Sequence, residues 1–423
     1  MCKHAEAGHA HGSHDHAHDH GDGNPDGELC PNHHAHSHES GGRGAQRSSR
    51  RDFFRILMGG ALAGASVTEL AYHRAAWARA AAEGADAKLF DLQQATDGVF
   101  FAQARVQALI NCNAAIFVRS KDVVVVDAHS KPSAAAALLA QIKREVTTKP
   151  VRYVINTHFH WDHSQGNQAY ARSVQKVDFI ATSATKKLMS ELAEARLKES
   201  MDSVPPQMEK LQKRAERSQS AEEKAWCADQ IRQMKAYLAE MKNYSMELPT
   251  ITFDQEHVLA DPAFDLHLQF HGRAHTAGDV FVLCPQRQAI ATGDASHGWL
   301  PFIRDGYPRR WPETIDAVKK IDFKYILGGH GPMRSDRMVM TEQRNYIEEL
   351  TERVEAAKKA GQSLEEMKKR ITVASLRSLQ SNGYGELVAT TVAAGNPHWG
   401  TAPPLQDGVN DNIREVLANL DRA

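Results

Sequence analysis

The sequence predicts an α/β fold for the part of the chain that begins near residue 85. Short runs of β-branched and aromatic residues alternate there with stretches of helical periodicity. Hydrophobic residues make up 42% of the 423 residues, which is enough for a buried core. Lys and Arg (51) nearly balance Asp and Glu (52), so there is no net basic charge to recruit nucleic acid, and we expect no nucleic-acid partner. Five cysteines exclude a disulfide-dense scaffold.

Residues 1–46 differ from the rest in composition. Eleven of the 23 histidines lie between His4 and His38, interleaved with Ala, Gly, Asp and Ser. With almost no large apolar side chain, this segment cannot offset the entropy of ordering, and we expect a disordered tail. Imidazoles and carboxylates are ligands for zinc, copper or nickel, so we expect weak metal binding. The alternative is a solvated tail without a dedicated metal.

Residues 47–83 have the features of an export signal. The segment Ser-Arg-Arg-Asp-Phe (residues 49–53) precedes an apolar run, Ile56–Val67. As a helix this run would span about 18 Å, short of a bilayer core of about 30 Å, so we expect no stable membrane span. The arginine pair resembles a twin-arginine signal, which implies the twin-arginine export machinery as a partner and a periplasmic mature protein. A basic helix start is the alternative.

The cleavage site of this signal is expected near Ala78-Arg79-Ala80, which has the small-x-small form. The His-rich tail precedes the arginines. It would therefore be cytoplasmic before cleavage and absent from the mature protein.

In the first half of the folded body we expect one helix and several strands. The helix is Pro132–Glu145. The expected strands are Val99–Phe101, Ala114–Val118, Val123–Asp127, Val151–Thr157 and Phe179–Ala181.

Residues 184–247 turn helical, and Pro205-Pro206 is expected to interrupt the helix, which predicts a helical hairpin inserted between strands. Strands resume at Ile251–Phe253 and Leu266–Phe270. Residues 340–423 form a final helical region, in which Ser363 and Glu366 predict a capping box. Its last helix has an apolar stripe of Ile413, Val416, Leu417 and Leu420.

The chemistry is concentrated in Thr-His-Phe-His-Trp-Asp-His, residues 157–163, directly after an expected strand. In an extended stretch, residues two apart face the same way, so His158 and His160 can reach one metal ion. A bend would send Asp162 and His163 to a second ion. A lone buried histidine is usually a core residue, but four ligand-type side chains at one strand end favour a metal site.

This motif resembles the metallo-β-lactamase fold hydrolases, whose signature is His-x-His-x-Asp-His after a strand. The remaining pieces follow in order: His275 in Gly-Arg-Ala-His-Thr-Ala-Gly-Asp, Asp294 in Thr-Gly-Asp, and His330 in Gly-Gly-His-Gly-Pro. The resemblance implies a four-layered αββα sandwich over residues 88–339, with the helical insertion within it and the C-terminal helical region after it.

The resemblance also implies the ligand sets. His158, His160 and His275 would bind the first metal, and Asp162, His163 and His330 the second, with Asp294 bridging both. The cofactors would be two divalent metal ions. Zinc is the expected metal at both sites, and iron and manganese are the alternatives.

The implied activity is hydrolysis by a metal-bridging hydroxide, with the metals stabilising the oxyanion. Asp162 and Asp294 are the expected catalytic residues, since Asp162 can also accept the proton of the nucleophile. Histidine ligands usually donate their other N–H to a further acceptor. Asp127 is one candidate for that acceptor, and a helix cap before Pro132 is its alternative role.

With an aspartate at position 294, the sequence resembles the glyoxalase II, lactonase, phosphodiesterase and alkylsulfatase branches of this family more than the true β-lactamases. The loop after it carries aromatic and arginine side chains, and there we expect substrate contacts from His297, Trp299, Arg304 and Tyr307. A loop packed on its own rings is the alternative.

A small organic ester, thioester or lactone is the expected substrate, because the insertion and this loop would overhang the metals. The alternatives are a β-lactamase or a sulfate or phosphate ester hydrolase, a metal-handling protein acting through its His-rich tail, and an iron-dependent oxidoreductase of the same fold.

Overall fold

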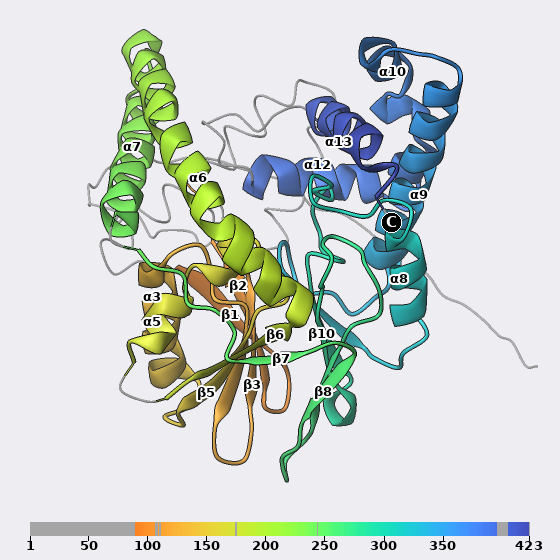
Figure 1. Ribbon diagram of the computed structural model, residues 1–423. Coiled ribbons are helices and arrows are strands. Elements are labelled where there is room, and N and C mark those ends of the chain that lie inside the picture. The colour runs from red at the N-terminus through yellow and green to blue at the C-terminus, as the bar shows by residue number, and fades with distance from the viewer. Residues whose placement is uncertain are drawn as a thin grey trace, which may run out of the picture. The chain divides into compact units, whose positions relative to one another are not determined.

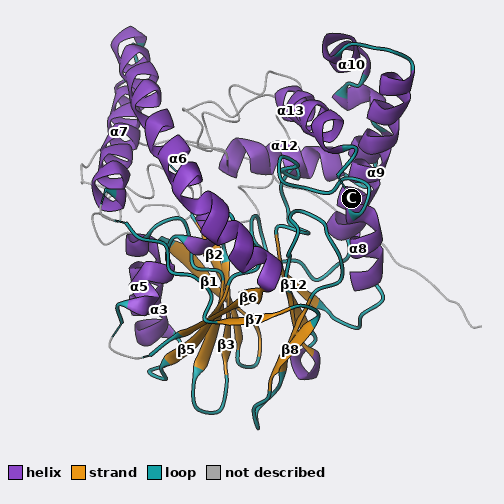
Figure 2. Ribbon diagram, in the orientation of Figure 1, coloured by secondary structure: helices purple, strands orange, loops and turns teal. Residues whose placement is uncertain are grey.

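The computed structural model describes residues 89–105, 109, 111–173, 176–242, 244–395 and 405–422, and for 391–395 the backbone alone. The His-rich tail and the signal segment lie outside these residues. Within them, two β-sheets lie between helices (Figures 1 and 2).

The first sheet has seven strands in sequence order. They are β1 (Phe90–Thr96), β2 (Val99–Ala104), β3 (Ala114–Val118), β4 (Val123–Val126), β5 (Val151–Ile155), β6 (Asp178–Thr182) and β7 (Ile251–Phe253). Strands β1 to β4 pair antiparallel, and β4 to β7 pair parallel.

Strand β4 is buried on both faces, which explains its run of four valines. Val124 and Val126 belong to the core that the first sheet shares with the second. Val123 and Val125 belong to the core on the other face, formed with helices α3 (Pro132–Glu145) and α5 (Asn167–Ala171). This alternation with a period of two places the first sheet between a helical layer and the second sheet.

The second sheet has five strands in the order β12-β11-β10-β9-β8. Their bounds are β8 (Glu256–Leu259), β9 (Leu266–Gln269), β10 (Phe281–Cys284), β11 (Ala289–Gly293) and β12 (Tyr325–Gly328), with a 3-10 turn, η2 (Pro285–Arg287), between β10 and β11. Strands β11 and β12 are parallel, and the other pairs are antiparallel.

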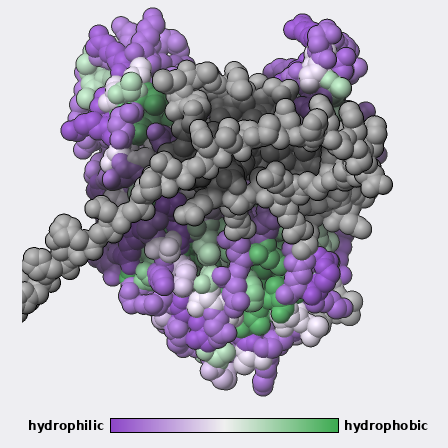
Figure 3. Space-filling model, turned by 180° about the vertical axis from the view of Figure 1, so that it is seen from behind, coloured by the Kyte–Doolittle hydropathy of each residue, from purple (hydrophilic) through white to green (hydrophobic). Residues whose placement is uncertain are grey.

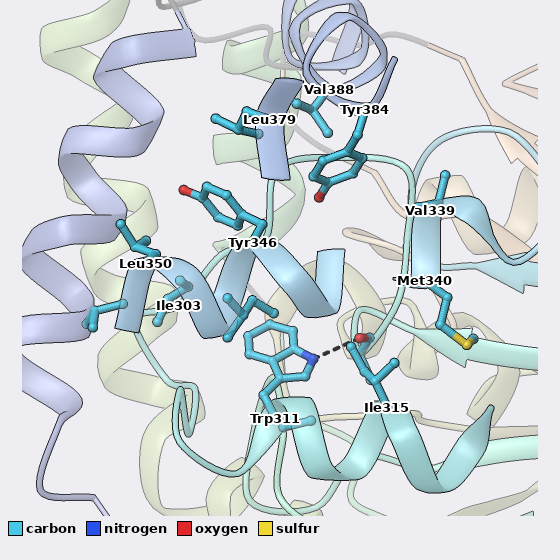
Figure 4. Close-up of a cluster of buried hydrophobic side chains, with 14 of the residues drawn as sticks. Ile303, Trp311, Ile315, Val339, Met340, Tyr346, Leu350, Leu379, Tyr384 and Val388 are labelled. Atoms are coloured by element: carbon cyan, nitrogen blue, oxygen red, sulfur yellow. Dashed lines mark hydrogen bonds between the residues drawn. The ribbon is translucent and has the colours of Figure 1, made fainter. Parts of the chain in front are cut away.

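The outer face of the second sheet is covered by the C-terminal helices. These are α8 (Trp311–Val318), α9 (Met338–Lys359), α10 (Leu364–Arg370), α11 (Arg377–Gln380), α12 (Tyr384–Gly395) and α13 (Leu405–Asn419), with a 3-10 turn, η3 (Val373–Ser375). Trp311 and Tyr346 are fully buried in this core, and the Trp311 indole N–H donates to the carbonyl of Ala295 at 2.8 Å (Figure 4). The three cores confirm the four-layered αββα sandwich.

The insertion consists of helices α6 (Ser183–Arg217) and α7 (Ala221–Met241), which pack as a hairpin (Figure 1). The expected interruption at Pro205-Pro206 is wrong, because α6 continues through both prolines and the turn comes after Arg217. Both prolines are exposed, so water can solvate the carbonyls that lose their donors. The buried neighbours Val204 and Leu211 hold this part of α6 in the core with α7, which offsets the cost of about 3 kcal/mol per proline.

Several local predictions are confirmed. The expected bounds of α3, β3 and β7 match the structure, and Ser363 and Glu366 form the capping box. The apolar stripe of α13 packs into the core. No helix in the described part of the chain combines the length and apolarity that a membrane span requires.

Candidate metal centre

Six of the seven predicted ligands lie at the carboxyl ends of two parallel strand pairs, one in each sheet. The motif of residues 157–163 follows β5, Asp294 follows β11, and His330 follows β12. His275 lies on the loop between β9 and β10. Because the carboxyl ends of parallel neighbours meet at one edge of a sheet, the four segments converge although up to 172 residues separate them.

The motif turns through a short helix, α4 (Trp161–Ser164), rather than an open bend. His160 is its N-cap residue and still has extended backbone, whereas Asp162 and His163 lie within the helical turn. The change from extended to helical backbone gives Asp162 and His163 a different direction from His158 and His160, although the His158 and His163 ring centroids remain 4.1 Å apart.

The first cluster contains three imidazoles. The Nδ1 atom of His160 lies 3.1 Å from Nε2 of His158 and 2.9 Å from Nε2 of His275. His158 and His275 are fully buried, and the His160 side chain is 11% exposed. These three nitrogens form one of the groups that could hold a metal ion.

The second cluster contains Asp162, His163 and His330. Oδ2 of Asp162 lies 3.1 Å from Nε2 of His330 and 3.5 Å from Nε2 of His163. Asp294 lies between the clusters: Oδ2 is 3.3 Å from Nε2 of His330 and 3.7 Å from Nε2 of His275, and Oδ1 is 3.4 Å from Nε2 of His163. The structure thus brings all seven side chains together.

These spacings fit metal ions. Ligand atoms about 2.1 Å from a tetrahedral ion lie about 3.4 Å from one another, close to the separations found here. In addition, Oδ1 of Asp294 is buried without a hydrogen-bond donor. A buried carboxylate oxygen without a donor is costly unless a cation compensates it, so the residues fit a metal on both sides of Asp294.

The charges of the metal-free cluster point the same way. Burial lowers the pKa of His158 and of His275 well below the usual range, which keeps both imidazoles neutral and able to bind a cation. Burial also opposes protonation of His330, but the carboxylates of Asp294 and Asp162 outweigh it and raise the pKa of His330 to about 9. A proton therefore supplies the positive charge that a metal would otherwise provide.

Asp127 orients the second cluster. Its Oδ2 accepts from Nδ1 of His163 at 2.8 Å, and its Oδ1 accepts from the backbone N–H of Thr157 at 2.8 Å. Asp127 has a φ of 68°, an unusual conformation for a residue other than glycine that often marks functional sites. Its alternative role as a helix cap is wrong, because the N-cap of α3 is Lys131.

Sequence reasoning missed Asp305. Its Oδ2 lies 2.9 Å from Nε2 of His160, and its Oδ1 lies 2.7 Å from the guanidinium of Arg196 on α6. Burial opposes ionisation, but the hydrogen bond from His160 and the charge of Arg196 hold the pKa of Asp305 below its usual range. Its place in the loop after the Asp294 motif was the one available signal, and no spacing rule connects it with His160.

Two of the four expected substrate residues, His297 and Trp299, lie against the ring of the ligand His330, and the His297 centroid is 5.6 Å from that of His330. Trp299 stacks on His330 with ring centroids 4.2 Å apart. His297 is buried, its backbone N–H donates to Gln343, and burial lowers its pKa to about 4. Arg304 pairs with Glu199 on α6 at 3.1 Å.

Tyr307, the fourth of these residues, has the guanidinium carbons of Arg273 and Arg422 5.2 and 5.5 Å from its ring centroid. Substrate contact by the four residues stays a prediction.

Phe302 is the aromatic side chain that the fold leaves exposed beside the first cluster. It is 47% exposed, with its ring centroid 5.6 Å from that of His160 and 6.2 Å from that of His275. Its carbonyl accepts from Nδ1 of His275 at 3.0 Å. Among the described residues, the large hydrophobic side chains that are exposed are Phe302 and Val258. Hydrophilic residues cover much of the described surface seen in Figure 3.

Two solved structures and one family model are similar to this chain. A metallo-beta-lactamase from Pontibacter korlensis is 18% identical, with a TM-score of 0.45 over 61% of this chain and 98% of that one. A metallo beta lactamase from Erythrobacter litoralis, solved with beta mercaptoethanol in its active site, is 15% identical, with a TM-score of 0.43 over 62% and 97%. A sequence model of the metallo-beta-lactamase superfamily matches residues 109–330, more than half of the chain. The chain therefore belongs to the metallo-beta-lactamase superfamily and is a metal-dependent hydrolase.

Proposed function

We propose that the protein is a dinuclear zinc hydrolase that acts on a small carboxylic ester, thioester or lactone. The observation that carries the proposal is the position of Asp294, whose two oxygens face both ligand clusters. Zinc is the metal of choice because five imidazoles and two carboxylates make up the ligand set. When bound, two such ions would lower the pKa of a coordinated water and polarise the substrate carbonyl.

The protein's own residues would hold this site rigid. Each first-cluster imidazole has an acceptor or neighbour on its second nitrogen: Thr157 Oγ1 beside His158, Asp305 beside His160, and the Phe302 carbonyl beside His275. Asp127 does the same for His163. Such contacts fix the ring orientations before substrate arrives, so little reorganisation is needed during the reaction.

Asp162 would have a second role as a proton acceptor. Its Oδ2 lies beside Nε2 of both His330 and His163, and the Asp162 side chain is buried. A carboxylate at this point can accept the proton released by the attacking water and keep the nucleophile aligned.

The ion pairs of α6 and of the loop after Asp294 favour an apolar substrate over an anionic one. Arg304 pairs with Glu199, Arg196 pairs with Asp305, and Arg309 pairs with Glu355 at 2.7 Å. These guanidinium groups are already neutralised, so they attract a carboxylate or sulfate group weakly. The exposed ring of Phe302 instead offers a contact for an apolar acyl group.

The insertion favours a small substrate because it is attached on two sides of the site. Helix α6 contacts the loop after Asp294 through Arg196 and Glu199. Helix α7 contacts the motif helix α4, since the Tyr237 ring lies 6.3 Å from that of Trp161. These contacts support a walled site that admits an ester or lactone and excludes a polymer.

A substrate panel with parallel metal analysis tests the proposal. We expect two zinc ions per folded chain and turnover of carboxylic esters, thioesters or lactones, with slow or no turnover of β-lactams, sulfate esters and phosphodiesters. Dominant sulfatase, phosphodiesterase or β-lactamase activity would contradict the substrate class. Iron with oxygen consumption would favour the oxidoreductase alternative. Metal confined to the His-rich tail would favour metal handling.

A further inference from the structure

Two consecutive contacts connect the insertion helix α6 to a metal ligand. The guanidinium of Arg196 donates to Oδ1 of Asp305 at 2.7 Å, and Oδ2 of the same carboxylate lies 2.9 Å from Nε2 of His160. The three side chains are 25%, 12% and 11% exposed, respectively. Each carboxylate oxygen thus has one partner, and water is largely excluded from the contact.

The outer nitrogen of His160 is the one in the first cluster whose contact leads to the insertion. His160 directs Nδ1 toward His158 and His275, so its Nε2 points away from the cluster. The outer nitrogen of His158 lies beside the adjacent residue Thr157, and that of His275 lies beside a backbone carbonyl. The Thr157 hydroxyl is in turn held by Asp127, after β4, whereas the Asp305 carboxylate beside His160 is held by Arg196 of the insertion.

The start of α6 is well placed to hold Arg196 in position. The hydroxyl groups of Thr182 and Thr185 donate to the carbonyl of Gly278 at 2.8 and 2.9 Å, on the loop that carries His275. Arg196 follows Thr185 by about three helical turns, so both lie on the same face of the helix. The face of α6 that is attached to the site therefore also presents Arg196 to Asp305.

We propose that Arg196 is a positioning residue of the metal centre. It holds Asp305 where that carboxylate orients the His160 ring, so that affinity for the first metal depends on the insertion. The inference rests on the proposed metal centre, and it gives the insertion a role in metal binding in addition to any role as a wall.

A neighbouring ion pair provides a matched control. Glu199, also on α6, pairs with Arg304 of the same loop at 3.1 Å, but the two side chains are 56% and 43% exposed and the pair includes no ligand. Glu199→Gln therefore removes a link between the same two segments without affecting His160. Arg196→Gln and Asp305→Asn remove the proposed contact itself.

The experiment measures cobalt binding to the full-length protein by chelator competition, together with the visible spectrum and the thermal midpoint. The His-rich tail contributes the same background to each variant. We expect Arg196→Gln and Asp305→Asn to bind one of the two ions about 10- to 100-fold more weakly, with an altered cobalt spectrum. Glu199→Gln should match the wild type, and Arg196→Lys should recover part of the affinity.

Wild-type affinity and spectrum in Arg196→Gln would overturn the inference while leaving the metal centre intact. An equal loss in Glu199→Gln would also overturn it, since the effect would then be general loosening of the insertion. Wild-type protein that binds no cobalt outside the tail would instead overturn the proposed metal centre.

Discussion

Substituting Gly329 by alanine should disable the metal centre although it adds a single methyl group. Gly329 precedes His330, and its N–H donates to the carbonyl of Gly293 at 2.9 Å. A Cβ at this position would lie 2.8 Å from Cε1 of His163 and 3.1 Å from the carbonyl carbon of Gly293, and closer still to Oδ1 of Asp294. The backbone contact cannot widen without breaking the hydrogen bond, so the two side chains must move.

The size of the effect follows from the overlap. Ordinary contact requires about 3.4 Å or more, so Asp294 must shift by about 1 Å, which is a large part of a metal–ligand bond of about 2 Å. Overpacking of this kind costs about 1–3 kcal/mol, and a misplacement of about 1 Å can reduce turnover about 100-fold. We expect a thermal midpoint lower by several degrees and metal affinity lower by a similar factor of about 100.

Gly298→Ala is the control for this substitution. Its Cβ would meet the Cδ atom of Pro332 at 3.4 Å as its nearest neighbour, which is an ordinary contact. Elemental analysis after dialysis against a weak chelator, with thermal unfolding of both variants, compares the two sites. If Gly329→Ala retained its metals and its turnover like Gly298→Ala, the placement of Asp294 behind Gly329 would be refuted.

Three further predictions concern protonation, substrate and export. Metal uptake near pH 7 should release protons, because His330, with its pKa of about 9, is protonated before the metal binds and must lose that proton to become a ligand. Calorimetry in buffers of different ionisation enthalpy measures this release. Metal affinity should therefore fall as the pH falls. Phe302→Ala should lower kcat/KM for esters with long apolar acyl groups by about 10- to 100-fold relative to acetate esters. The reason is that burying the ring against the substrate is worth about 1.5–3 kcal/mol. An unchanged ratio of kcat/KM between the two ester classes would remove Phe302 from the substrate site. Replacing Arg50 and Arg51 by lysine should retain the metal-loaded protein in the cytoplasm, and periplasmic fractions containing this variant would contradict the signal assignment.

The sequence by itself determined the local features. Residues 157–163 contain four ligand-type side chains directly after a run of strand-forming residues. Because these side chains are so close in the chain, the end of the strand presents them together. The bounds of α3 and β3 were predictable for a similar reason, because a proline at a helix start and a short continuous apolar run act over a few positions. Short strands such as β8 and β12 were not predicted, since four residues carry too little periodicity.

The tertiary structure alone decided which distant residues support the ligands. Asp305 and His160 are 145 residues apart, and Arg196 and Asp305 are 109 apart, so no local pattern connects them. Pro205 breaks most isolated helices, but here packing of α6 on α7 outweighs its local preference. Arg304 was expected to contact substrate because it lies in an aromatic and arginine-containing loop, but the fold pairs it with Glu199. Local preference acts through neighbours in the chain, whereas partner choice depends on which surfaces the folded layers bring together.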